Sequence, residues 1–158
     1  MKKVVLILAF LSSFLSADIF EEGRLSFGVS AGVGTSYGNT YSLVGLDANY
    51  FLVDNFSAGI SYRSWFGAEP TQQELAFGAN YFIPVNDKLR PYVGAFVRET
   101  FLSDYTDFTS FGARGGVAIT MSPNSYIGVG YAYEQYSSCV RDSECSTSYP
   151  EVVFVLSF

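Results

Sequence analysis

The chain has 158 residues, of which 15 are acidic and nine are basic, so its net charge at neutral pH is −6. This acidic balance excludes nucleic acid as a partner, because a phosphate backbone requires a basic surface. Although 49% of the residues are apolar and 18% are aromatic, no apolar run beyond the N-terminus has the roughly 20 residues of a transmembrane helix.

The chain starts with "MKKVVLILAFLSSFLSA", which has the pattern of a secretory signal peptide. Two lysines precede an apolar stretch at residues 4–11, and Ala17 is an acceptable cleavage point. A short membrane anchor is the alternative, but the stretch is too short to span a bilayer and is interrupted by serines. We therefore expect residues 1–17 to be removed and residues 18–158 to form one domain, either a soluble β-sandwich or a closed membrane barrel.

Eight segments then follow in which apolar residues alternate with small or polar ones, as in strands with two different faces. Each is close to the roughly 9–11 residues that a tilted strand needs to cross a bilayer. The expected strands are residues 25–34, 42–52, 56–65, 73–83, 91–100, 110–121, 126–136 and 149–158.

The connections between these segments alternate in character. Tight turns ("VDN", "PVNDKL" and "SPN") follow the second, fourth and sixth segments, whereas looser segments follow the odd-numbered ones. Short turns on one side and longer loops on the other are typical of outer-membrane barrels, and an even strand count places both termini on the turn side.

The two faces of the expected strands distinguish a membrane barrel from a soluble one. In residues 25–34 one face is apolar, while the other carries only serine and glycine, which suits the narrow interior of a barrel whose outside meets lipid. A soluble lipocalin-like barrel would have the opposite arrangement, with large apolar groups around a ligand cavity. Aromatic residues near the segment ends fit two interfacial girdles: Tyr50, Phe56, Tyr81 and Phe158 on the turn side, and Tyr62, Phe111 and Tyr133 on the loop side. The sequence therefore predicts an all-β, eight-stranded antiparallel up-and-down transmembrane β-barrel.

Several ionisable residues fall on the small-residue face and are expected inside the barrel. Buried charges are costly unless they are paired, and eight strands leave room only for side chains, so we predict a paired network that fills the interior. A narrow gated channel for small solutes or ions is the alternative. The predicted interior charge network consists of Asp47, Arg63, Glu74, Arg98, Arg114, Glu134 and Glu151.

Catalytic chemistry is not expected. The chain contains no histidine, which excludes Ser-His-Asp and similar arrangements. A carboxylate pair such as Glu134 and Glu151 could do acid–base work, but both are better explained as partners of Arg114. We therefore predict no catalytic residue, no cofactor and no metal.

The two cysteines, Cys139 and Cys145, bracket a five-residue stretch. A metal site would need further ligands nearby, so a small disulfide loop formed in an oxidising compartment is the better interpretation.

The end of the chain carries the most specific resemblance to a known family. Apolar side chains alternate through Val152, Phe154, Leu156 and Phe158, and this strand resembles the C-terminal signal that the barrel-assembly machinery reads. With "NYF…DNFSAGISY" and "LRPYVGAFV", residues 23–158 resemble the small eight-stranded outer-membrane barrels typified by the OmpA membrane domain and OmpX.

The resemblance implies an integral protein of the outer membrane of a Gram-negative bacterium. It implies a monomer in contact with lipid and lipopolysaccharide. Its role would be structural, or would lie in surface interactions. An external ligand would meet the loops at residues 101–108 and 137–148, because loops on a rigid scaffold carry function in such proteins.

Overall fold

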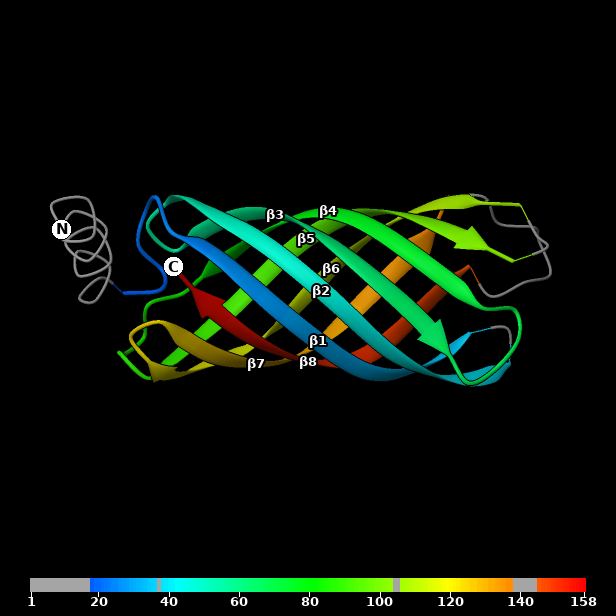
Figure 1. Ribbon diagram of the computed structural model, residues 1–158. Coiled ribbons are helices and arrows are strands. Elements are labelled where there is room, and N and C mark those ends of the chain that lie inside the picture. The colour runs from blue at the N-terminus through cyan, green and yellow to red at the C-terminus, as the bar shows by residue number, and fades with distance from the viewer. Residues whose placement is uncertain (1–17, 37, 104–105, 138–144) are drawn as a thin grey trace, which may run out of the picture.

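The computed structural model describes residues 18–36, 38–103, 106–137 and 145–158. Eight antiparallel strands follow one another around a closed barrel, and both described ends of the chain lie on the same side (Figure 1). The strands are β1 (Leu25–Ser36), β2 (Asn39–Val53), β3 (Phe56–Phe66), β4 (Gln72–Phe82), β5 (Leu89–Leu102), β6 (Phe108–Ser122), β7 (Ser125–Tyr136) and β8 (Ser146–Ser157). Within these ranges, no helix is long and apolar enough to cross a membrane.

Each strand pairs with the next, and β1 pairs with β8 to close the barrel. This last pairing runs from Ser26 opposite Ser157 to Gly32 opposite Glu151. The backbone N–H of Phe158 then donates to the carbonyl oxygen of Leu25 at 3.0 Å, which extends the seam to the end of the chain. The predicted eight-stranded antiparallel up-and-down barrel is confirmed.

The first connection differs from the prediction of a loose loop. β1 and β2 remain paired up to Ser36 opposite Asn39, well beyond residues 34 and 42, where strands were expected to end and begin. Gly38 has a φ of +73°, a left-handed conformation that glycine adopts without steric cost and that tight hairpin turns require. The prediction missed this hairpin because "TSYGNT" is too polar to continue the alternating apolar pattern.

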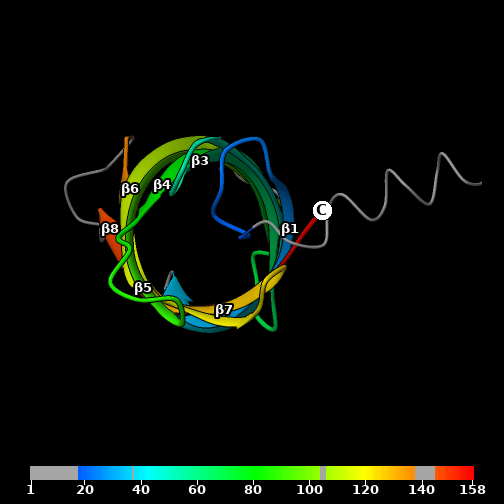
Figure 2. The ribbon, with the colours of Figure 1, turned by 90° about the vertical axis from the view of Figure 1, so that its left-hand side faces the viewer.

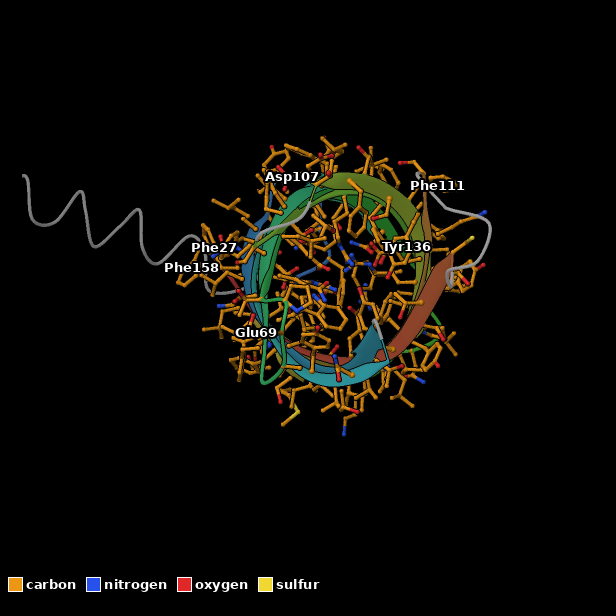
Figure 3. All side chains as sticks on the ribbon, turned by 90° about the vertical axis from the view of Figure 1, so that its right-hand side faces the viewer. Phe27, Glu69, Asp107, Phe111, Tyr136 and Phe158 are labelled. Carbon is orange, nitrogen blue, oxygen red and sulfur yellow. The ribbon has the colours of Figure 1, made fainter. Side chains whose placement is uncertain are left out.

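The outer wall of the barrel is apolar along every strand. Phe27, Phe111 and Phe158 point outward (Figure 3), and the rings of Phe27 and Phe158 pack side by side across the closing seam. A soluble monomer rarely exposes a continuous apolar surface of this extent, whereas a barrel in lipid requires one.

The interior holds two clusters of buried apolar side chains. The turn-side cluster comprises Ile19, Phe20, Phe51, Phe82, Tyr92, Ala118, Tyr126 and Val155. The loop-side cluster comprises Tyr41, Leu43, Trp65, Phe96, Ala132 and Tyr149. Glycines make room for the larger groups: a Cβ at Gly34 would lie 2.6 Å from Trp65, and one at Gly45 would lie 2.7 Å from the Arg63 side chain. The small-residue face of the strands thus leaves room for large side chains from nearby strands.

Candidate functional site: the interior charge network

Six of the seven predicted interior charges come together in the barrel, one from each of strands β3 to β8. Arg63 and Arg98 are each only 1% exposed, so their guanidinium groups are fully withdrawn from solvent. Figure 3 shows nitrogen and oxygen atoms gathered inside the ring of strands. The six residues are Arg63, Glu74, Arg98, Arg114, Glu134 and Glu151.

Tyr149 is the centre of this network. Its hydroxyl oxygen accepts a hydrogen bond from Arg63 at 2.9 Å and another from Arg98 at 2.8 Å. Two positively charged guanidinium groups therefore share one neutral acceptor. Their charges are compensated by carboxylates that contact the same two arginines. Tyr149 was not among the predicted interior residues, although it has the same parity as Glu151 and therefore belongs to the inward face of β8.

Arg63 and Arg98 each have their own carboxylate partners. Arg63 donates to Glu151 at 2.9 Å. Arg98 donates to Glu134 and lies 3.2 Å from Glu74. Glu134 also accepts a hydrogen bond from the hydroxyl of Ser110, a residue that the sequence analysis did not select. Each of these buried ions has a partner of opposite charge, which offsets much of its desolvation cost. Glu74 Oε2 and the Nε atoms of Arg63 and Arg98 have no hydrogen-bond partner among the described residues.

The expectation that Glu134 and Glu151 both pair with Arg114 is wrong for Glu134, whose partner is Arg98. Residue parity predicts that a side chain points into the barrel, but it does not give the tilt of the strands. The tilt determines which charged side chains lie at the same position along the barrel axis. Arg114 lies 3.7 Å from Glu151, the longest separation among the ion pairs of the described residues, and its guanidinium packs 4.8 Å from the ring centre of Phe96.

Asp47 stands apart from the other charges. It is only 9% exposed, yet it has no ion-pair partner within 4.0 Å in the described part of the chain. Its Oδ2 atom has no hydrogen-bond partner within that same part. Asp47 lines a polar cavity of about 40 Å³ together with Asn49, Asn80, Tyr92 and Arg114, among others. This space is large enough for water but not for a larger solute.

The external loops are only partly described. Asp107 is exposed at the end of one of them, and its carboxylate accepts from the backbone N–H of Leu102 at 3.3 Å. At the base of the loops, Phe108 packs edge to face on Tyr136, and the Ser137 N–H donates to the Thr109 carbonyl at 3.0 Å. The strands that carry the two loops are therefore joined firmly at the rim.

Parts of the predicted loop sites lie outside the described residues, namely 104–105 and 138–144. Cys139 is among them, so its disulfide with Cys145 stays a prediction. Among the residues that are described, no group of three or more histidine, cysteine, aspartate or glutamate side chains is placed to hold a metal ion.

The sequence matches no described protein family and none of the curated proteins. Solved structures with the same fold are found at low identity. The N-terminal β-barrel domain of Pseudomonas aeruginosa OprF aligns with a TM-score of 0.68 and 16% identity over 87% of this chain and 98% of that one. Neisserial surface protein A aligns with a TM-score of 0.63 and 16% identity over 85% of this chain and 96% of that one.

One similar structure carries a catalytic activity. The outer membrane enzyme PagL aligns with a TM-score of 0.54 and 14% identity over 82% of this chain and 98% of that one. These likenesses show that the chain has the fold of small outer-membrane β-barrels. Since that fold serves both enzymes and other proteins, activity has to be judged from the residues of this chain.

Proposed function

We propose that this chain, which has the fold of the small outer-membrane β-barrels, is an integral outer-membrane protein with a closed interior and a structural or surface-interaction role. The observation that carries the proposal is the paired network around Tyr149. It fills the loop-side half of the lumen with buried ions whose charges are compensated, and the described cavities that it borders hold only about 40 and 20 Å³.

The outer wall supports the membrane placement. Large apolar side chains face outward on each strand, which is unfavourable in water and favourable in hydrocarbon. Val152, Phe154, Leu156 and Phe158 belong to this wall, so the predicted assembly signal is presented on the outside of β8. On this proposal the protein is a monomer that contacts lipid and lipopolysaccharide, and the barrel-assembly machinery reads the last strand.

A non-enzymatic role is part of the proposal. The whole sequence lacks histidine, and the two carboxylates that were candidates for acid–base work are occupied by arginines. Surface interaction would then fall to the loops at residues 101–108 and 137–148, which stand on a rim braced by Phe108 and Tyr136.

A narrow gated channel is the second candidate, and one contact favours it. The Arg114–Glu151 pair has the longest separation of the network and borders the polar cavity. A path for ions through the barrel would therefore open at this pair with the smallest cost in free energy.

Ion conductance of the refolded protein in a planar bilayer tests the proposal against the channel. Folding is first verified by heat-dependent gel mobility, and Arg114→Ala is measured beside the parent protein. We expect a folded barrel without conductance steps. Discrete steps that change in Arg114→Ala would contradict the closed interior and make the protein a small channel.

A further inference from the structure

Residues 18–24 precede β1 and fold back over the turn-side mouth of the barrel. Figure 2 shows this segment in dark blue, looping from the edge at β1 into the opening of the ring of strands. Ile19 is 0% exposed and Phe20 is 1% exposed, so they are as buried as the innermost residues of the strands. The segment "DIFEEGR" lacks an alternating pattern, so no role was predicted for it from the sequence.

Phe20 forms the centre of the turn-side cluster. Its ring is stacked on Tyr126, with ring centres 5.2 Å apart. It also packs against Phe82 at 4.7 Å and edge to face on Phe51 at 5.9 Å. These three rings come from β7, β4 and β2, so one side chain from outside the sheet joins strands on different sides of the lumen.

Arg90 holds the segment from the opposite side. Its guanidinium carbon lies 4.3 Å from the centre of the Phe20 ring, an attractive cation–π geometry. The same group donates to the Asp18 carboxylate and, at 2.7 Å, to the side-chain oxygen of Asn55. The Asn55 backbone N–H in turn donates to the Phe20 carbonyl at 2.8 Å. Asp18, Phe20 and the turn between β2 and β3 are thus tied to one arginine.

Phe20 also separates the mouth from the polar cavity. Phe82 and Tyr126 contact Phe20 and line the cavity, which Ser30 and Asp47 border as well. The Ser30 hydroxyl and the Asp47 Oδ2 atom are buried without a hydrogen-bond partner in the described chain. Buried polar atoms of this kind gain free energy when water reaches them.

We propose that residues 18–24 are a built-in plug, and that the turn-side mouth is a binding site for an acidic–apolar–aromatic segment which the chain's own Asp18, Ile19 and Phe20 occupy. Residues 18–22 form no backbone hydrogen bond with a strand in the described chain, whereas Gly23 and Arg24 anchor the end of the segment through backbone hydrogen bonds with Phe51 of β2. The ion pair of the free part is partly solvated, since the Asp18 side chain is 35% exposed. Release of this part therefore costs far less than opening a strand. Release would connect the cavity at Ser30 and Asp47 with the turn side, while the network around Tyr149 keeps the loop side closed.

Thiol labelling inside the cavity tests this proposal. Ser30→Cys, in a background where Cys139 and Cys145 are replaced by serine, reports access through its reaction with the small reagent methanethiosulfonate ethylammonium. We expect slow labelling in this parent. In Phe20→Ala the rate should rise roughly tenfold or more, because labelling of a buried group follows the population of the open state. Arg90→Gln should raise it less, since the ring contacts remain.

Glu22→Ala is the matched control. The Glu22 side chain lies in the same segment but is exposed, so its removal should leave the labelling rate at the parent value. Heat-dependent gel mobility verifies that every variant is folded. Equal labelling rates in folded Phe20→Ala, Arg90→Gln and the parent would overturn the plug. An equal increase in Glu22→Ala would overturn it too, because a general loosening of the mouth would then explain the result. Conductance has no part in this test, so it is independent of the channel question.

Discussion

The two halves of the lumen are filled by different means. On the turn side, rings pack on rings around Phe20, and the ion pair between Arg90 and Asp18 lies partly exposed at the rim. On the loop side, three arginines and three glutamates are interleaved with Tyr149, Trp65 and Phe96. The apolar half is stabilised by the surface that it removes from water, whereas the charged half is stable only while every partner is present.

The largest effect should come from breaking the charged half. Arg98→Ala would leave Glu74 and Glu134 buried without their cation and is expected to destabilise the barrel by about 3–5 kcal/mol. Urea unfolding in lipid vesicles measures the change. Lys88→Ala is the control, because Lys88 is exposed in a turn and should be nearly neutral. Similar unfolding midpoints for both variants would contradict the view that the network is structural.

The apolar half should respond by a different mechanism. Phe82→Ala removes a buried ring from the turn-side cluster and leaves a cavity, at an expected cost of about 3 kcal/mol. Restoring volume with Phe82→Leu should recover much of this loss in the same unfolding assay, since no charge is left unpaired. If Phe82→Leu were as unstable as Phe82→Ala, packing would not be what holds this half together.

A smaller loss of stability should follow when the shared hydroxyl of the network is removed and all of its charges are kept. Tyr149→Phe keeps the ring but removes the oxygen that accepts from both Arg63 and Arg98, which should cost about 2 kcal/mol. Tyr131→Phe is the matched control, because the Tyr131 hydroxyl contacts Ser148 on the exposed outer face. An unchanged midpoint in Tyr149→Phe would mean that the arginines are held by their carboxylates alone.

The sequence predicts the fold well because period-two alternation is a local property. Ser26, Gly28 and Ser30 lie inside and Phe27 and Val29 lie outside, as their parity requires. Strand ends were less predictable, because pairing continues into polar residues such as Ser36 and Asn39, where the apolar pattern has already stopped.

The sequence predicts which charged residues lie inside the barrel, but not which of them pair with one another. Parity selects the inward charges, yet the pairing of Glu134 with Arg98 depends on tilt and on side-chain reach across the lumen. Tyr149 was overlooked because an inward tyrosine near a strand start resembles a girdle residue. Phe20 was overlooked because nothing local marks a residue that becomes buried only when the chain folds back.

The closing seam has a consequence for how the barrel is made. Ser157 on β8 meets Leu25 at the start of β1, and 132 positions separate them in the sequence. Seven of the strand pairs join strands that are consecutive in the sequence. The eighth, between β1 and β8, has the entropic cost of bringing the two ends of nearly the whole chain together, so it is expected to form last. Until then both β1 and β8 present unpaired N–H and C=O groups, which hydrocarbon cannot solvate. The open barrel is therefore disfavoured inside the membrane, and forming the seam satisfies the backbone groups of both edges in one step.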